Sequence, residues 1–191
     1  LYHKDIRTFG SGNAGMTNVL RTYGKLPAVF TTIGDVGKSV AAVNLGRFIF
    51  GALLSGTGAA WQNPLDPVCG AYLAAIFCMI GHSRPIFFGF KGGKGILCSG
   101  TLLLLLDWRI ALVGWGAFVV LWLTTRYVSL GSVAAAVSLP FTTYFVFHNT
   151  ACTVLGTCIS LLVLWAHRSN IKRLLNLSLI HISEPTRRRG I

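Results

Sequence analysis

Hydrophobic residues in this chain gather into six long runs that are separated by short polar segments. The runs cover residues 27–50, 68–81, 96–107, 109–125, 127–147 and 150–166. Because a helix needs about 20 apolar residues to cross a bilayer core, the pattern predicts an all-α integral membrane protein, a helical bundle of six visible transmembrane helices. Runs 68–81 and 96–107 are short for a crossing, so we expect them to extend into neighbouring loops or to begin within the protein.

An ionisable pair interrupts the first run. Asp35 and Lys38 lie there beside Gly34 and Gly37. The i, i+3 spacing of the pair places both side chains on one face of a helix. Since charged groups are costly in lipid, the pair is predicted to face the interior of the bundle.

Counting the runs places most of the basic residues at one end of the bundle. Even numbers of runs separate residues 1–26, the loop 82–95, Arg126 and the segment from residue 167. These segments hold Lys4, Arg7, Arg21, Lys25, Arg84, Lys91, Lys94, Arg126, Arg168, Lys172 and Arg173. The opposite side holds Arg47 and Arg109. The positive-inside rule therefore predicts that the basic end is cytoplasmic.

The composition narrows the classes of partner. Of the 191 residues, 53% are hydrophobic and only 12% are charged, which a soluble protein of this size could not accommodate. The net charge of +12 is compatible with nucleic acid, anionic lipid or a phosphorylated substrate. Basic residues in short loops between apolar runs favour a membrane topology with an anionic substrate and argue against nucleic acid. The five cysteines have no C-x-x-C or zinc-like spacing, so we expect small buried thiols and no metal site.

The first polar motif is GSGNAGMTN, residues 10–18, followed by Arg21. It matches G-x-G-x-x-G, and Asp35 follows where a dinucleotide site would place an acid. The preceding KDIRTF is not a buried strand and a membrane span follows, which excludes that interpretation. What remains is a glycine-rich turn whose backbone and polar groups suit an anion. Its candidate ligands are Ser11, Gly12, Asn13, Thr17, Asn18 and Arg21.

The second motif is GHSRPIFFGFKGGKG, residues 81–95. It fails as a Walker loop, because Phe88 stands where glycine is required and Gly95 stands where Ser or Thr would bind magnesium. Flexible backbone donors and two ammonium groups still suit a phosphomonoester, and a helix beginning at Gly95 would add its dipole. The candidate ligands here are His82, Lys91, Gly92, Gly93 and Lys94.

The third motif is HRSNIKR, residues 167–173, directly after the last run. His167 and Asn170 are three residues apart, and Arg173 lies a further turn along, so all three share a face if the helix continues. The segment RYVSLGS brings Arg126 and Ser129 to the same end of the bundle.

Taken in order, these four motifs closely resemble the PlsY family over essentially residues 4–176. The resemblance implies a seven-helix enzyme of the bacterial inner membrane, multi-pass, with its active site on the cytoplasmic side. It implies transfer of a fatty acyl group from acyl phosphate to the 1-position of glycerol 3-phosphate, giving lysophosphatidic acid and phosphate without a metal or other cofactor. The implied partners are the two substrates, membrane lipid and an enzyme that produces acyl phosphate.

The resemblance also implies residue roles. Ser11, Arg21, His167 and Asn170 match catalytic positions. The matched or neighbouring substrate-binding and phosphate-binding positions are Gly12, Asn13, Thr17, Asn18, Lys38, His82, Lys91, Gly92, Gly93, Lys94, Arg126 and Ser129. We expect Ser11 to donate to an oxyanion or phosphate rather than to act as a nucleophile. His167 and a phosphate oxygen of the substrate are both candidate acceptors of the hydroxyl proton.

The two ends of the chain look atypical for that family. The chain opens at Leu1 without the family's first helix, and residues 177–191 resemble translated sequencing adapter. We therefore expect one acyltransferase domain over residues 1–176 and a non-native tail. The alternative function is a membrane transporter for a phosphorylated small solute, which the basic vestibule and the pair Asp35 and Lys38 would suit. Polar motifs on one side only, and no internal repeat, count against it.

Overall fold

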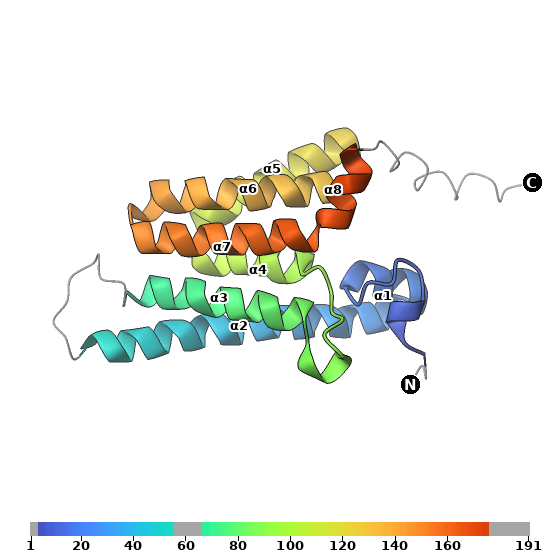
Figure 1. Ribbon diagram of the computed structural model, residues 1–191, viewed down its shortest axis with the longest axis horizontal. Coiled ribbons are helices and arrows are strands. Elements are labelled where there is room, and N and C mark those ends of the chain that lie inside the picture. Colours follow the sequence, from blue (N-terminus) through green and yellow to red (C-terminus); the bar gives the residue numbers. More distant parts are fainter. Residues whose placement is uncertain (1–3, 56–65, 176–191) are drawn as a thin grey trace, which may run out of the picture.

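The computed structural model describes residues 4–55 and 66–175, and its regular structure in these ranges is helical (Figure 1). In chain order the elements are η1 (Ile6–Thr8), α1 (Met16–Tyr23), α2 (Lys25–Ser55), α3 (Pro67–Ser83), η2 (Ile86–Phe88), α4 (Ile96–Leu106), α5 (Trp108–Thr125), α6 (Val128–Phe147), α7 (Thr150–Ala166) and α8 (Arg168–Leu175). Each of the six hydrophobic runs forms one helix, α2 to α7. The tail 177–191 lies outside the described residues.

Polar caps begin the helices at the end of the bundle opposite the basic motifs. Asp66 accepts a hydrogen bond from the backbone of Val68 at 2.7 Å and begins α3. Asp107 caps α5 and Asn149 caps α7 in the same way. Such caps satisfy backbone N–H groups that have no partner inside the helix. Two of the four acids in the described residues therefore have a structural task far from the basic end.

Helix lengths confirm a multi-pass membrane protein and separate the long spans from the short ones. In the described part of the chain, α2, α3, α5 and α6 are long and apolar enough to cross a bilayer. A fifth span results if α7 and α8, which are bent by 64° at His167, are counted together. Run 68–81 extends as expected. Helix α4 has 11 residues, about 16 Å of helix, and is too short to cross a core of about 30 Å alone.

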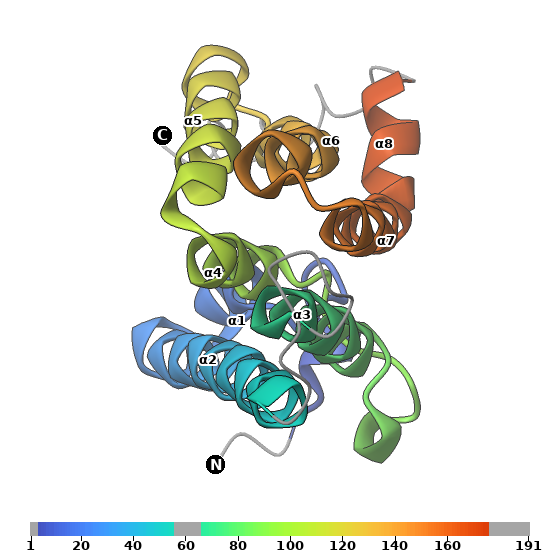
Figure 2. The same cartoon turned by 90° about the vertical axis from the view of Figure 1, so that its left-hand side faces the viewer.

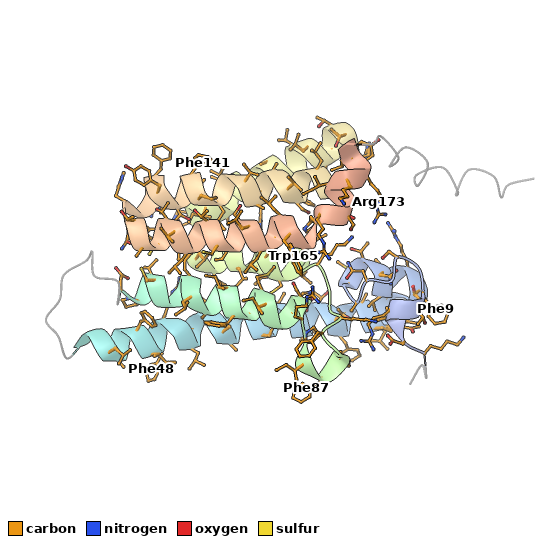
Figure 3. All side chains as sticks on the ribbon, in the orientation of Figure 1. Phe9, Phe48, Phe87, Phe141, Trp165 and Arg173 are labelled. Atoms are coloured by element: carbon orange, nitrogen blue, oxygen red, sulfur yellow. The ribbon has the colours of Figure 1, made fainter. Side chains whose placement is uncertain are left out.

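The interior of the bundle is small and closely packed, and its outside is apolar. Helices α3, α4 and α7 lie in the middle, with α2 on one side and α5 and α6 on the other (Figure 2). Tyr72 is fully buried and its hydroxyl lies 2.8 Å from the Thr143 hydroxyl, which links α3 to α6. Large side chains such as Phe48 and Phe141 point outwards from the helices (Figure 3). An outer surface covered by large apolar side chains suits contact with lipid.

Because even numbers of hydrophobic runs separate them, the predicted polar segments come together at one end of the bundle. Helices α1 and α8, the turn η2 and the junction between α5 and α6 all lie at the same end of the bundle (Figure 1). Segments that are more than 150 residues apart in sequence therefore share one surface. The prediction that the basic motifs meet at one end is confirmed.

Two glycines set the distance between α2 and α3. A Cβ atom on Gly46 would collide with the backbone carbonyl of Gly70, and the reverse substitution collides with the carbonyl of Gly46. Because backbone on both sides is fixed by helical hydrogen bonds, neither contact can be relieved by turning a side chain. The two helices lie this close because both positions lack a side chain.

We expect Gly46→Ala to destabilise the bundle by about 1–3 kcal/mol, because the added methyl group forces α2 away from α3. The measurement is unfolding of the detergent-solubilised protein by heat or denaturant. Gly34→Ala is the matched control on the same helix, since a Cβ there meets no atom within 4 Å. The control should be neutral or slightly stabilising. Equal effects of the two substitutions would contradict the close contact.

Candidate active site

The glycine-rich turn before α1 is organised by the side chain of Asn18. Its Nδ2 donates to the backbone carbonyls of Ile6, Phe9 and Asn13 at 3.3, 3.0 and 2.9 Å. Its Oδ1 accepts from the backbone N–H of Ser11 at 3.0 Å. Asn18 is buried, so these bonds are shielded from water. Both ends of its amide are thus engaged with the turn, and the turn presents Ser11 at the surface.

The second motif folds back onto the end of α3. The backbone N–H groups of Gly92 and Gly93 donate to the carbonyls of Ser83 and His82 at 3.2 and 3.3 Å. A Cβ on Gly92 would collide with the His82 carbonyl. This close approach explains the glycine and holds Lys94 against the bundle. As predicted, Gly95 immediately precedes a helix, α4, whose N-terminus points its free N–H groups to this end.

A chain of hydrogen bonds joins three distant segments behind this loop. The Lys94 ammonium donates to Asn170 Oδ1 at 2.8 Å, and Asn170 Nδ2 donates to the Ser129 hydroxyl at 2.7 Å. Arg173 approaches the same Asn170 oxygen at 3.4 Å. Asn170 is buried, and burial, followed by the charge on Arg173, lowers the pKa of Lys94. The predicted association of Lys94, Ser129 and Asn170 is therefore seen as direct contacts.

His167 sits at the bend between α7 and α8 and is fully buried. Its Nδ1 lies 2.9 Å from the carbonyl oxygen of Val163. A carbonyl can only accept, so Nδ1 carries the proton and Nε2 carries the lone pair of the neutral ring. Nε2 is enclosed and has no hydrogen-bond partner among the described residues. The prediction that His167 and Asn170 share a helix face required a continuing helix, and the chain instead bends by 64° between α7 and α8.

These segments surround a cleft of about 350 Å³. It is lined by residues 11–13, 83–84, 90–94, 165–166, 168–169 and Arg173. The lining includes Arg84, Lys91, Lys94, Arg168 and Arg173. No carboxylate occurs among these lining residues, so the positive charges are not compensated within the cleft. A concave, water-accessible site with this charge favours a phosphate-bearing ligand.

Arg84, Trp165 and Arg168 are among the lining residues that were not candidates from sequence. Both guanidinium groups contact the Trp165 ring, with Arg84 at 4.8 Å and Arg168 at 4.3 Å from its centroid. Trp165 and Arg173 both lie at the end of the bundle that carries the cleft (Figure 3). The arginines stand inside the second and third motifs, which was the available signal, but their charge was assigned to membrane topology alone. Trp165 was not a candidate because it lies inside the hydrophobic run 150–166.

Three other candidates lie outside the cleft. Thr17 and Arg21 are exposed on α1, and Arg126 is exposed at the end of α5. None of the three is among the residues that line the described cleft. Arg126 adopts a left-handed conformation, with φ of 63°, that ends α5 and turns the chain into α6. All three share the basic end of the molecule with the cleft.

Lys38 and His82 form a cluster below the cleft. Lys38 Nζ lies 2.6 Å from Asp35 Oδ1 and 2.6 Å from His82 Nδ1, and His82 Nδ1 is 3.3 Å from the same Asp35 oxygen. The prediction that Asp35 and Lys38 pair towards the interior is confirmed for Asp35, which is buried, while Lys38 stays half-exposed. The other ring nitrogen of His82 lies directly beneath Gly93.

The thiols divide between the interior and the outer surface. Cys69, Cys98 and Cys152 are buried as expected, whereas Cys158 is exposed on the apolar outside of α7. In residues 4–55 and 66–175, no three His, Cys, Asp or Glu side chains come together as a metal site would require.

Comparison with known proteins places this cleft in context. The family model described as glycerol-3-phosphate acyltransferase matches residues 1–177. The glycerol-3-phosphate acyltransferase of Clostridioides difficile is 41% identical over 172 residues, which is 90% of this chain and 79% of that protein. The enzyme of the same name from Thermosynechococcus vestitus is 37% identical over 171 residues, 90% of this chain and 79% of that protein.

Two crystal structures of PlsY (YgiH), an integral membrane glycerol 3-phosphate acyltransferase, share the fold at 29% identity. The glycerol 3-phosphate form has a TM-score of 0.71 and covers 91% of this chain and 80% of that chain. The lysophosphatidic acid form has a TM-score of 0.67, with 87% and 78% covered.

We expect Gly92→Ala to weaken binding of inorganic phosphate by about tenfold, because the methyl group pushes the loop off the His82 carbonyl and displaces Lys94. Calorimetric titration of phosphate into the detergent-solubilised protein measures the change. Gly81→Ala is the control, since a Cβ there meets no atom within 4 Å. Unchanged phosphate affinity in Gly92→Ala would show that the loop position does not matter.

Proposed function

This chain belongs to the PlsY family of glycerol-3-phosphate acyltransferases, and we propose that its cationic cleft uses acyl phosphate as the acyl donor. The chain is thus an integral membrane enzyme that forms lysophosphatidic acid. In the proposed reaction the 1-hydroxyl oxygen of glycerol 3-phosphate attacks the acyl carbonyl carbon. The bond from that carbon to the phosphate oxygen breaks, inorganic phosphate leaves with the electron pair, and a substrate phosphate oxygen takes the hydroxyl proton.

The observation that carries this proposal is the set of uncompensated cations in the cleft. Two phosphate-bearing substrates must lie side by side for the transfer, and their negative charges repel each other. Five basic side chains without a carboxylate in the cleft lining offset that repulsion. Because acyl phosphate already has a good leaving group, positioning and charge stabilisation supply most of what the reaction needs.

The structure suggests a separate role for each group of polar residues around the cleft. We assign the glycerol 3-phosphate phosphate to Lys94 and Arg173, with Asn170 and Ser129 fixing the ammonium group. Ser11 at the opposite wall would donate to the oxyanion or to the departing phosphate. Together with Gly12, Asn13, Lys91 and Gly93, which also line the cleft, it would form a rim over the reacting atoms. These roles follow from the positions of the side chains around the cleft.

The candidates outside the cleft are proposed to act indirectly. Asn18 would hold the turn that carries Ser11, and Lys38 with His82 would support the loop under Gly93. Arg21, Arg126 and Thr17 would raise the positive potential or polarity at this end and so favour the arrival of anionic substrates. A positioning role for Lys38 and His82 replaces the direct phosphate contact expected from sequence.

We also propose an orientation and a supply route. The basic end would face the cytoplasm of a bacterial inner membrane. The polar segments at that end carry the eleven basic residues named above, and all of them except Arg7 are exposed or line the cleft. The positive-inside rule assigns such an end to the cytoplasm. A soluble enzyme that makes acyl phosphate would deliver the donor to the same side. Residues 1–176 would act as one domain.

The test is an assay of the full-length protein, purified in detergent, with acyl phosphate and glycerol 3-phosphate. Phosphate release should require both substrates and should match the lysophosphatidic acid formed. Lys94→Ala should lower kcat/KM by roughly 10²-fold to 10³-fold, because a half-buried cation proposed to contact phosphate is lost. Lys172→Ala is the matched control: this lysine lies on the same end, is exposed and does not line the cleft. Turnover with acyl-CoA but none with acyl phosphate would overturn the donor assignment.

The lowered pKa of Lys94 predicts an alkaline limb in the activity profile. Lys94 binds phosphate as an ammonium ion, so kcat/KM for glycerol 3-phosphate should be full at lower pH and should fall as pH rises through a pKa below 10.5. Arg173→Gln removes one of the charges that lower this pKa, so the limb should move to higher pH. Profiles measured at constant ionic strength test this, with Lys172→Gln as the control. A limb that stays in place in Arg173→Gln would contradict the coupling.

A further inference from the structure

The loop that carries Lys91 and Lys94 also carries an exposed apolar tip. The turn η2 projects away from the bundle beside α3, and Phe87 points outwards from it (Figures 2 and 3). The exposed fractions of Ile86, Phe87 and Phe88 are 73%, 95% and 62%. Three adjacent large apolar side chains this exposed mark an interaction surface rather than scattered surface residues.

The tip is held rigidly relative to the cleft. The backbone N–H groups of Phe88 and Phe90 both donate to the Pro85 carbonyl, at 3.2 and 3.0 Å. The base of the loop is closed by the hydrogen bond from Gly92 to Ser83 at 3.2 Å. Phe90 lines the cleft, only two residues from the tip. A force that positions the tip therefore also positions the wall of the cleft.

An arginine from the N-terminal segment fixes the direction of the tip. Arg7 Nη1 donates to the Phe88 carbonyl at 2.5 Å, and its guanidinium carbon lies 5.9 Å from the Phe88 ring centroid. Asp5 orients that guanidinium through Nε and Nη2, at 2.9 and 2.6 Å. The turn is thus presented by a built contact between segments that are 81 residues apart.

We propose that η2 is an anchor that inserts into the interfacial layer of the bilayer. The neighbouring spans also expose large apolar side chains, among them Phe77 on α3 and Phe30 on α2. The candidate membrane span that begins with α3 at Pro67 ends at Phe88, in η2. Aromatic residues at the end of a span favour the headgroup region. Lys91, whose backbone N–H donates to the Phe88 carbonyl at 3.4 Å, adds a cation that complements anionic headgroups.

The anchor would also affect how the cleft binds the acyl phosphate donor, and this part of the inference rests on the proposed function. A long-chain acyl phosphate carries its acyl chain in the bilayer and its phosphate at the surface. A tip inserted into the interface would hold Phe90 and Lys91 at the depth where that phosphate lies. The anchor would then assist capture of the lipid-like donor and leave glycerol 3-phosphate, which arrives from water, unaffected.

The first test measures depth and does not depend on activity. Full-length protein with Cys158→Ser and Phe87→Cys is labelled with an environment-sensitive fluorophore and reconstituted into vesicles of zwitterionic and anionic phospholipid. Brominated acyl chains should quench the label at position 87. A label at Thr8→Cys is the matched control, since Thr8 is exposed at the same end next to Arg7, and it should remain accessible to an aqueous quencher. The protein without either introduced cysteine corrects for the remaining thiols.

The second test is kinetic. In vesicles, Phe87→Asp should raise KM for long-chain acyl phosphate by about tenfold, with kcat and KM for glycerol 3-phosphate unchanged. Phe87→Leu keeps an apolar side chain and should retain the parent values. If the parent does not use acyl phosphate, the proposed function fails while the depth measurement still decides the anchor.

Two results would overturn the anchor. One is equal access of the aqueous quencher to labels at positions 87 and 8 in vesicles. The other is protection of position 87 that arises only when a soluble protein is added, which would identify η2 as a protein-docking surface instead.

Discussion

Hydrocarbon offers no hydrogen-bond partner to a peptide group, and this constraint determines where the enzyme can place its chemistry. Each apolar run must close its own backbone hydrogen bonds, so all six become helices. Irregular backbone is confined to the ends of the bundle. The two glycine-rich motifs, which need free N–H groups and close backbone contacts, can therefore exist only at an end, and the number of crossings places both at the same one.

That constraint also explains which features could be predicted from sequence. Apolar run length predicts α2 to α7, since burial in lipid overrides local propensity. The spacing of glycines with Lys94 predicts a phosphate-binding loop because the chemistry is contained in one segment. The contacts of Asn18 and His82 could not be predicted in this way. Asn18 reaches back twelve residues to Ile6 within its own turn, and His82 meets Lys38 from another helix, so both depend on the folded path of the chain.

The charge of the cleft is costly without substrate. Arg84 and Arg168 both contact the Trp165 ring, and Lys94 and Arg173 share the Asn170 amide oxygen. Such arrangements place like charges close together. Burial, followed by the charge on Arg173, lowers the pKa of Lys94. Phosphate groups supply the missing counter-charge. Binding a phosphate-bearing ligand therefore gains more free energy in this site than in a neutral pocket of the same size. This favours a reaction in which both substrates carry phosphate.

The position of His167 bears on the acceptor of the hydroxyl proton. Its neighbours Ala166 and Arg168 line the cleft, whereas His167 itself is fully buried beneath them with Nε2 enclosed. To act as the base, this nitrogen would have to be uncovered by a shift at the bend between α7 and α8. A phosphate oxygen of a substrate bound in the cleft, as proposed above, would need no such movement. The geometry therefore favours the substrate phosphate as acceptor, with His167 holding the bend that presents Asn170 to Lys94.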